Sequence, residues 1–521
     1  MNRIIYLISC SFLLSVPFHG FELNKYSKYL TRSNGNFPDS NGIIDIESED
    51  NDVIWIGTGA GLGYLNTSLN SEILFESVDA GSNIPTGGTP ALFVESNIIV
   101  YSGVTQEYMA TTESYEPKGT GIGYSIDSGI SWNYMPQPIC TICEALYQSI
   151  PWGEQYLVSL AVTTEVNNVS YDVGVKGNYV YASSWAGGLR RFDYSLVSPA
   201  WEVIPLPMDE QDSLMCDFID LDSYELNPRD PNDGGNHNHK GFSVLGTDNY
   251  LWVGTANGIN RGTINGDCIN WYHQTTANGL SGDWVVGIEN QLTDSIDRIW
   301  AITWSAGPGQ FNSISYTDNY GVSWQEIDYF TEKNIKIYNL DFDEEKVYAA
   351  SEEGLFYSED LIHWEKISRS WIDSITGDII LDETVYSVFI GDALFIGTGE
   401  GLVIDDQTYR FWNNSAELKS ENLGFSVYPN PFFTSQDGVF NGDGHVHFIY
   451  YNPNNLKSEI DIYDFTMQHV IKLSEKINID DESIMIWDGR DKTGNRVVNG
   501  TYFCKLIINN TVYWTKLMVI N

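Results

Sequence analysis

The sequence predicts an all-β protein, because one sequence pattern recurs about every 47 residues. Each copy is an apolar run, a break rich in glycine, serine or threonine, and a second short run, as in Leu251–Thr255 followed by Asn257–Ile259. Short runs rich in β-branched and aromatic residues between turn residues are typical of strands. A period of this length with several strands per repeat predicts a β-propeller.

Seven copies of the pattern can be placed, and each has room for four strands. They are centred on Trp55, Tyr101, Tyr181, Trp252, Trp300, Tyr348 and Phe395. We therefore predict seven blades over residues 40–413, with six or eight as the alternatives. The intervals on either side of Tyr181 exceed the period, which predicts two insertions.

The charge balance excludes one class of partner. The chain of 521 residues carries 70 acidic and 27 basic residues, a net charge of −43, and this would repel nucleic-acid phosphates. The acidity fits either a well-solvated surface or calcium binding.

The first residues predict export. Met1-Asn2-Arg3 precedes an apolar stretch from Ile4 to Phe18, which is typical of a secretory signal peptide over residues 1–21. After processing, five cysteines remain: Cys140, Cys143, Cys216, Cys268 and Cys504. In an exported chain the Cys140/Cys143 pair favours a local disulfide over zinc, and the odd number leaves at least one thiol.

A second recurring signal lies in the turns between the predicted third and fourth strands. Ser125–Trp132 resembles the Asp-box pattern of sialidases and of many non-enzymatic propellers, with Asp127 and Trp132 at its defining positions. The related turns carry Asn319 with Trp324, and Asp360 with Trp364. The carboxylate is expected to accept backbone N–H groups and the tryptophan to pack between blades, so we interpret these residues as structural.

Two further segments resemble known families. Asn278–Ile288 and Val169–Val175 look like the inner strands of two-component-regulator propeller repeats, a family without a single activity. After a polar linker at 414–424, residues 425–521 resemble a FlgD-like immunoglobulin domain, through Val427–Phe432, Ile460–Asp464 and Trp487–Asp491. Such domains overlap in sequence with the C-terminal sorting domain of type IX secretion, which implies either a contact with secretion machinery or a passive terminal module.

Candidate binding residues gather on one predicted face. The two insertions, at 136–168 and 207–241, and an expanded loop at Thr105–Gly119 all belong to connections on the same side of the blades, where functional loops concentrate. Trp185 and Trp304 are expected at the mouth of the central channel on this side. Tyr108 and Trp152 complete the predicted ligand-binding set. The alternative for the tryptophans is a hydrophobic cover over the insertions.

The second insertion contains a weak metal signal. Its oxygen and nitrogen donors are Asp230, Asn232, Asp233, His237 and His239. Alternating Asp and Asn suit calcium, and histidines suit transition metals. No bidentate glutamate follows, so a turn-rich surface loop is the preferred interpretation. Calcium is the candidate cofactor if the loop binds a metal.

No nucleophile or zinc-hydrolase motif is present in the sequence. We therefore predict an exported, non-catalytic binding or scaffold protein at the cell surface, with a polysaccharide or an envelope protein as ligand. The alternatives are an accessory component of type IX secretion and an extracellular glycan-active hydrolase or lyase. An inward-facing carboxylate pair with raised pKa beside Trp185 or Trp304 would favour the enzyme.

Overall fold

The computed structural model confirms the all-β fold. It describes residues 40–49, 52–66, 74–78, 81, 84–110, 113–139, 147–160, 164, 166–217, 223–367, 371–372, 379–380, 383–405, 407–409, 425–428, 430–433, 445–452, 454–474, 476–479, 482–509 and 511–520. Within these residues one α-helix occurs, α1 (Asp328–Lys333), with the 3₁₀ turns η3 (Pro231–Asp233), η4 (His237–His239) and η5 (Thr276–Asn278). The predicted signal peptide, the linker and the Cys140/Cys143 pair lie outside the described residues.

The chain divides into two compact units. Among the described residues, those of Ile44–Tyr338 belong to the first unit, and those of 40–43 and Asn339–Asn521 belong to the second. The first five repeated sheets fall almost wholly in the first unit. The remaining two sheets, apart from Ile337 and Tyr338 at the start of the sixth, and the C-terminal domain belong to the second.

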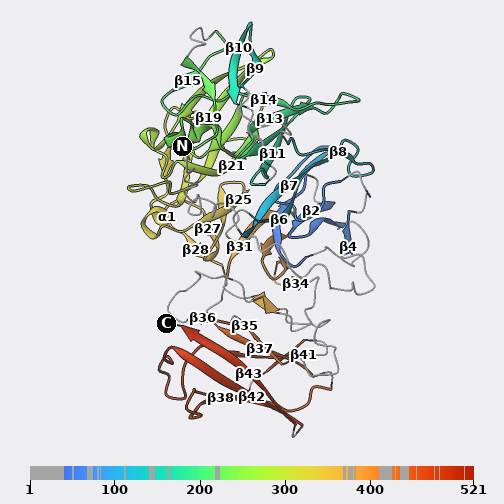
Figure 1. The fold of residues 1–521 in the computed structure, drawn as a ribbon, viewed down its shortest axis with the longest axis vertical. Coiled ribbons are helices and arrows are strands. Elements are labelled where there is room, and N and C mark those ends of the chain that lie inside the picture. Colours follow the sequence, from blue (N-terminus) through green and yellow to red (C-terminus); the bar gives the residue numbers. More distant parts are fainter. Residues whose placement is uncertain are drawn as a thin grey trace, which may run out of the picture. The chain divides into compact units, whose positions relative to one another are not determined.

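Each repeated sheet contains four consecutive antiparallel strands, which is the blade architecture of a β-propeller (Figure 1). The first two sheets contain β1 (Ile43–Glu47), β2 (Val53–Thr58), β3 (Gly61–Asn66) and β4 (Leu74–Ser77), then β5 (Leu92–Glu95), β6 (Ile98–Met109), β7 (Ser114–Ser125) and β8 (Asn133–Met135). The third contains β11 (Ser170–Lys176), β12 (Tyr179–Ser184), β13 (Gly188–Asp193) and β14 (Glu202–Ile204). The fourth contains β17 (Gly241–Gly246), β18 (Leu251–Thr255), β19 (Gly258–Asn265) and β20 (Cys268–Gln274), with β15 (Ser213–Leu214) at its outer edge. The fifth contains β21 (Trp284–Leu292), β22 (Asp297–Trp304), β23 (Ser313–Thr317) and β24 (Gln325–Glu326).

The second unit continues the series. Its sheets contain β25 (Ile337–Asp343), β26 (Lys346–Ser351), β27 (Gly354–Ser358) and β28 (Glu365–Lys366), then β31 (Val385–Ile390), β32 (Leu394–Thr398), β33 (Leu402–Ile404) and β34 (Gln407–Tyr409). The short strands β29 (Trp371–Ile372) and β30 (Ile379–Ile380) pair between them. Seven four-strand repeats are thus present among the described residues, at the places the sequence predicted. Their closure into one seven-bladed ring stays a prediction.

A turn closed by a threonine or serine hydroxyl explains why these residues recur in the sequence pattern. Thr58 closes the β2–β3 turn by donating to the Gly61 carbonyl (2.8 Å) while accepting the Ala60 N–H (3.2 Å). Thr255 makes the same pair of bonds in the fourth sheet. A side chain that replaces backbone partners in a tight turn is the reason why threonine or serine recurs at this position.

The turns whose sequences resemble Asp-boxes contain the expected side-chain-to-backbone hydrogen bonds. Asp127 accepts the Ser131 N–H (2.8 Å) and the Ser131 hydroxyl (2.6 Å), and Trp132 packs edge-on against Trp55 of the preceding sheet (centroids 5.9 Å apart). In the fifth sheet Asn319 accepts the Ser323 N–H (3.0 Å), while Trp324 packs against Trp252 (6.2 Å). Asp360 accepts two backbone N–H groups in the same way, and its Trp364 is buried.

Replacing Asp127 by alanine should lower the melting temperature of the full chain by a few degrees, because the turn loses its side-chain acceptor. Differential scanning calorimetry measures the effect. Asp127→Asn is the matched control, since Asn319 already performs this role in the fifth sheet, and it should melt close to the wild type. Equal melting of both variants and the wild type would show that the turn does not depend on this side chain.

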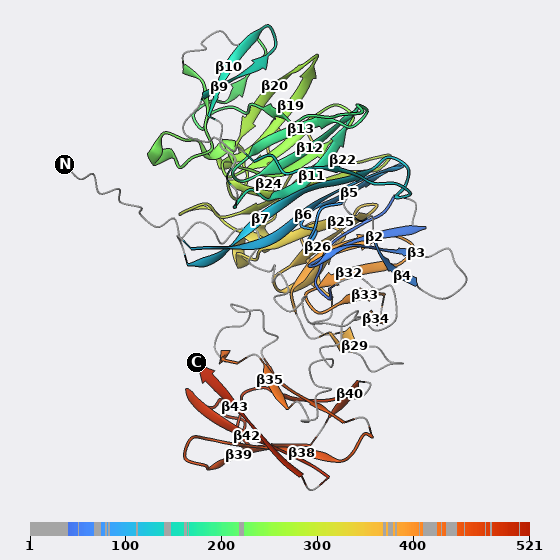
Figure 2. The same ribbon diagram turned by 45° about the vertical axis from the view of Figure 1, so that its right-hand side comes forward.

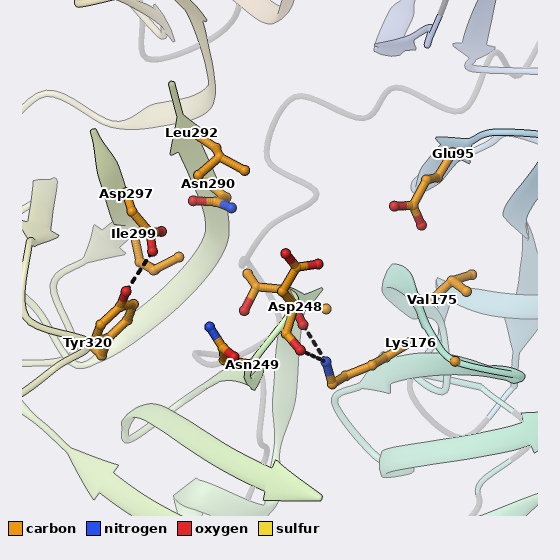
Figure 3. A pocket seen from close by; sticks show the side chains of 13 residues that line it. Glu95, Val175, Lys176, Asp248, Asn249, Asn290, Leu292, Asp297, Ile299 and Tyr320 are labelled. Atoms are coloured by element: carbon orange, nitrogen blue, oxygen red, sulfur yellow. Dashed lines mark hydrogen bonds between the residues drawn. The ribbon is translucent and has the colours of Figure 1, made fainter. Parts of the chain in front are cut away.

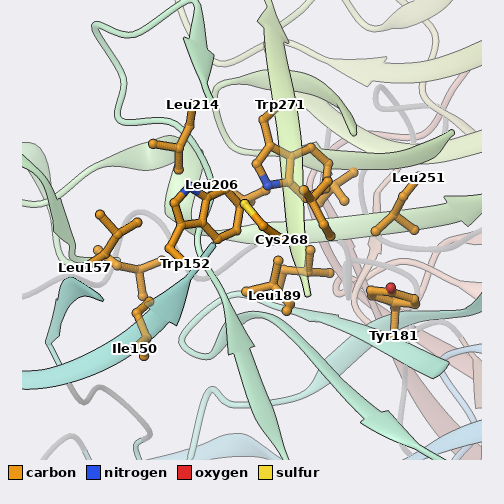
Figure 4. Close-up of a cluster of buried hydrophobic side chains, with 14 of the residues drawn as sticks. Ile150, Trp152, Leu157, Tyr181, Leu189, Leu206, Leu214, Leu251, Cys268 and Trp271 are labelled. Atoms are coloured by element: carbon orange, nitrogen blue, oxygen red, sulfur yellow. The ribbon is translucent and has the colours of Figure 1, made fainter. Parts of the chain in front are cut away.

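The two insertions join into one additional sheet. β9 (Tyr147–Trp152) and β10 (Gln155–Leu160) of the first pair antiparallel, and β16 (Glu225–Leu226) of the second pairs parallel to β10; β9 and β10 lie side by side in Figure 1 and Figure 2. A buried cluster ties this sheet to the third and fourth repeated sheets (Figure 4). Its large members are Trp152, Tyr181, Leu206, Tyr224 and Trp271. A disulfide between Cys216 and Cys268, whose pairing the sequence did not predict, links the second insertion to β20.

The segment predicted as an expanded loop is a long hairpin instead. β6 and β7 are paired as far as Met109 and Ser114 (Figure 2), so most of Thr105–Gly119 continues the two strands. Its base is fixed by the end of the first insertion, because Gly119 N–H donates to the Asn168 side chain (2.8 Å).

The C-terminal domain is a two-sheet sandwich. One sheet contains β35 (Ser426–Tyr428), β37 (Val446–Tyr451), β41 (Glu482–Trp487) and β40 (Ile477–Ile479); the other contains β36 (Phe432–Phe433), β43 (Thr511–Ile520), β42 (Gly500–Ile508), β38 (Ser458–Tyr463) and β39 (His469–Leu473). The core between them includes Phe448, Tyr450, Trp487 and the free thiol of Cys504, whose pKa burial raises to about 12. The resemblance to a FlgD-like domain stays a prediction.

Candidate functional site

Six aromatic side chains gather in the first unit, four near the starts of the first strands β11, β17, β21 and β25 and two at the ends of the second strands β12 and β22. This aromatic cluster consists of Tyr171, Trp185, Phe242, Trp284, Trp304 and Tyr338. Phe242 lies between its neighbours, with ring centroids 5.3 Å from Trp185, 6.0 Å from Trp284 and 6.0 Å from Tyr171. Phe242 and Trp304 are buried, and the other four keep part of their surface exposed. The cluster is thus a supported aromatic surface.

β-Bulges explain how the cluster forms. β11 and β17 each contain one extra residue near the start, at Tyr171 and Phe242, and β21 contains one at Val286, which packs on the same cluster. An extra residue interrupts the ladder and re-aims its side chain. Here the bulges place Tyr171, Phe242 and Val286 in the same cluster.

Two lysines lie on the tryptophans of the cluster. The Lys240 ammonium lies 4.8 Å from the ring centroid of Trp185, and that of Lys336 lies 5.1 Å from the ring of Trp304. Ammonium groups over aromatic faces attract the ring quadrupole. In a chain with only 27 basic residues, two cations on one aromatic surface make it locally suited to a ligand with rings and negative charge.

Two carboxyl groups in the same unit, those of Asp172 and Asp45, have raised pKa values. Asp172, the residue after the β11 bulge, accepts the Val244 N–H of the next sheet (2.8 Å) and the Val173 N–H (2.8 Å). Enclosure by protein, together with a smaller contribution from the charge of Asp45, raises the pKa of Asp172 to about 8 against the opposing effect of the two N–H bonds. Burial likewise raises the pKa of Asp45 to about 7, although it accepts the Leu92 and Ile46 N–H groups. Both residues keep some exposed surface, so the carboxyls are enclosed but not sealed from water.

Three of the four predicted ligand-binding residues differ in their surroundings but keep a place in the cluster or at the surface. Trp185 lies in the cluster and is partly exposed; its role as a ligand-binding residue stays a prediction. Trp304 is in the same cluster but only 3% exposed, with its indole N–H donated to the Ile337 carbonyl (3.0 Å), so the prediction of an exposed ring is corrected to a supporting one. Tyr108 is 53% exposed near the hairpin tip, where it packs on Tyr115, and it remains available to a partner.

The prediction for Trp152 was wrong. Its ring is 1% exposed and its indole N–H donates to the Met215 carbonyl (3.2 Å). It therefore anchors the insertion sheet and does not contact a ligand.

The predicted metal loop is mostly organised by its own hydrogen bonds. Asp230 caps η3 and accepts the Asn232 N–H (2.9 Å), while Asp233 is exposed. His237 is held by its backbone N–H, which donates to Asp209 (2.9 Å), and burial lowers its pKa.

The prediction of His239 as a metal ligand is corrected. Its two ring nitrogens are occupied by hydrogen bonds with the Asn227 N–H (2.9 Å) and the Leu206 carbonyl (3.0 Å). Burial lowers its pKa to about 4. Among the described residues no group of three His, Cys, Asp or Glu side chains is placed to hold a metal. Calcium binding at Asp230 stays a prediction.

Comparisons by sequence identify no family: no family model matches the chain, and neither does any curated protein. Among the described residues no helix has the length and apolarity needed to cross a membrane.

Solved structures with a related arrangement include PorZ, an essential bacterial surface component of the type-IX secretion system of Porphyromonas gingivalis, at 14% identity and a TM-score of 0.39. That match covers 90% of this chain and 64% of PorZ, so this chain spans less than two thirds of PorZ.

Two others differ in role from PorZ. One is an extracellular domain ascribed to a hybrid two component system of B. thetaiotaomicron, at 11% identity, covering 92% of this chain and 80% of that one with a TM-score of 0.25. The other is virginiamycin B lyase from Staphylococcus aureus, at 15% identity, covering 71% and 94% with a TM-score of 0.35. At these TM-scores the similarities transfer no activity to this chain.

Proposed function

We propose that this chain is an exported, non-catalytic binding protein whose ligand docks on the aromatic cluster. The observation that carries the proposal is the partly exposed Trp185, supported from behind by Phe242 and crossed by the Lys240 ammonium. Aromatic faces held rigidly in this way stack on sugar rings or on partner side chains at low entropic cost. With two lysines present, an acidic polysaccharide is the ligand we favour, and an envelope protein is the alternative.

Retention of the full chain on immobilised acidic and neutral polysaccharides tests the proposal. Trp185→Ala should weaken retention on the acidic polymer about tenfold, because the stacking face and the seat of the ammonium are lost together. Trp514→Ala is the matched control, since Trp514 of the sandwich is an exposed tryptophan that also lies beneath a lysine, Lys505. Equal losses in both variants, or no retention by the wild type on any polymer, would count against the cluster as a glycan surface.

A glycan-active enzyme is the second candidate, and one observation favours it. Asp172 follows Tyr171 of the cluster directly, and with a pKa of about 8 it is largely protonated at neutral pH, as a general acid must be. Both of its oxygens already accept backbone N–H groups, which is the reason we place a structural role first. Product release from the same polysaccharides, abolished in Asp172→Asn while retention persists, would reverse this order.

A role beside the type IX secretion machinery is a further proposal, and it rests on the order of a repeated-sheet region followed by a C-terminal sandwich and on the motif resemblance of residues 425–521. Comparison of the full chain with a chain ending at 424, expressed in a host with that secretion system, tests it. Surface display that requires the terminal domain supports the role, and equal display of both chains removes it.

A further inference from the structure

One guanidinium beside the turn that carries Trp185 lacks a partner among the described residues. Arg190 lies in β13, and protein encloses most of its side chain, which lowers the pKa of the guanidinium to about 10. It makes no hydrogen bond and no ion pair with the part of the chain that the structure describes, and its Nε is closed to solvent without an acceptor. Enclosing a charge without a partner is unfavourable. A ligand that brings a negative charge would offset this cost.

Other partly buried cations of the same unit have the acceptors that Arg190 lacks. Arg191, the next residue, donates its Nε–H to the Glu202 carboxylate (2.8 Å). Lys176, which lines the polar cavity drawn in Figure 3, donates to two backbone carbonyls. The chain has 70 acidic residues, but none of those that the structure describes pairs with Arg190. A guanidinium left without an acceptor in so acidic a chain is suited to an acceptor that a ligand supplies.

The outer end of this guanidinium is open to a ligand. Arg190 keeps part of its surface exposed, and Nε is the nitrogen of its guanidinium that is both closed to solvent and unpaired. The two Nη groups, which also lack acceptors among the described residues, therefore keep access to solvent. Such a pair of N–H groups binds a carboxylate or a sulfate through two parallel hydrogen bonds.

The turn between β12 and β13 joins this guanidinium to the aromatic cluster. Gly187 lies in that turn, two residues after Trp185, and a Cβ placed on it would be 3.5 Å from Arg190 Nε. Hydrogen bonds fix the turn, since Ser184 Oγ accepts the Gly187 N–H (3.3 Å) and donates to the Asn168 carbonyl (3.2 Å). A stacking face and an unpaired cation therefore belong to one fixed hairpin.

We propose that Arg190 binds the acidic group of a sugar chain that stacks on Trp185, through two hydrogen bonds from its Nη groups. This inference rests on the proposed function and adds to it the residue that selects for negative charge. Lys240 and Lys336 already lie on tryptophan faces, whereas Arg190 has its charge available for the ligand. Two sources share the oxyanion chemistry: the carboxylate of a uronic acid and the sulfate ester of a sulfated sugar.

Isothermal titration calorimetry on the full chain tests the proposal with trigalacturonate and with its methyl ester, which keeps the sugar rings and removes the charges. The wild type should bind trigalacturonate about tenfold more tightly than the ester, and Arg190→Met should remove most of this preference. Arg298→Gln removes a guanidinium that is already paired with Asp318 (2.6 Å), and it should keep the preference. A sulfated galactose trisaccharide distinguishes the sources: tighter binding than trigalacturonate identifies a sulfated sugar, and weaker binding identifies a uronic acid. Equal affinity of the wild type for acid and ester, or a preference that survives in Arg190→Met, would overturn the proposal.

Melting temperatures separate this role from a structural one. Arg190→Met keeps most of the side-chain length and removes an unpaired charge, so without ligand it should melt at or above the wild type; a clear fall would show a structural role and overturn the proposal. Sodium glucuronate should raise the melting temperature of the wild type and of Trp185→Ala above that in sodium chloride of equal ionic strength, but not that of Arg190→Met. If this shift occurs without any retention on polysaccharides, the anion site stands and the proposed function fails. If retention occurs without the shift, the role of Arg190 fails alone.

Discussion

Replacing Trp152 by alanine should lower the free energy of unfolding by about 3–5 kcal/mol, which is the range for truncating a fully buried tryptophan. The ring is 1% exposed within the cluster that joins the insertion sheet to the third and fourth repeated sheets (Figure 4). Its removal leaves a cavity and also the Met215 carbonyl without its indole donor. Denaturant unfolding followed by fluorescence and by circular dichroism measures the change.

Tyr156→Ala is the control for this variant. Tyr156 lies on the neighbouring strand β10 and is 65% exposed, so its truncation should change stability by less than about 0.5 kcal/mol. If Trp152→Ala does not fold, Trp152→Phe keeps most of the ring and should cost about 1–2 kcal/mol through the lost hydrogen bond and contacts. Two equally small effects for Trp152→Ala and Tyr156→Ala would mean that the insertion sheet is not anchored through this core.

The burial of Trp152 is a feature that the sequence could not predict. The repeated sheets were predictable because their strands recur with a constant period, and the local turn chemistry of Thr58 or Asp127 recurs with them. An insertion has no period, so a lone tryptophan in it looks the same whether it faces solvent or core. Its burial arises from β16 and the Cys216–Cys268 bond, which bring together segments that are distant in the sequence.

The candidate site was predicted in part for the same reason. Trp185 and Trp304 stand at the ends of the equivalent strands β12 and β22, so their placement in one cluster could be predicted from the repeat. The residues that support them, Phe242 and Tyr171, lie at β-bulges. A β-bulge cannot be recognised from the sequence of one repeat. Alignment of the copies would have offered one signal: Asp45, Asp172 and Asn339 each follow an apolar or aromatic residue near the start of a first strand, and each accepts an N–H group from the next sheet.

The shared role of these three residues leads to a second large effect. Asp172→Asn should stabilise the protein at alkaline pH and flatten the pH dependence of its stability. The pKa of Asp172 is about 8 in the folded protein, against 3.8 as the ordinary value. The folded state therefore binds the proton more tightly than the unfolded state between these two values. The contribution of the Asp172 carboxyl to the free energy of unfolding is therefore fully present below pH 3.8 and is lost as the pH rises through about 8.

Asparagine cannot ionise, yet it can still accept the Val244 N–H, since Asn339 already accepts the Val388 N–H in the second unit (3.1 Å). One pKa unit corresponds to about 1.4 kcal/mol. Because Asp172 keeps some exposed surface, we expect about half of the full shift, a gain of about 2–3 kcal/mol near pH 9. The gain should shrink as pH falls and vanish near pH 4, where the wild-type carboxyl is protonated in both states.

Urea unfolding from pH 4 to pH 9 measures this dependence. Asp267→Asn, a charge change in the exposed turn between β19 and β20, should leave the slope unchanged. Asp45→Asn should act in the same direction as Asp172→Asn, and the double variant should gain less than the sum, because each neutral side chain relieves the other carboxyl of the repulsion that the structure places between them. A wild-type stability that rises from pH 5 to pH 9, or full additivity of the two substitutions, would show that these carboxyls are ionised and independent. The role of Asp172 as a proton-holding residue would then be excluded, and with it the strongest observation in favour of catalysis beside the aromatic cluster.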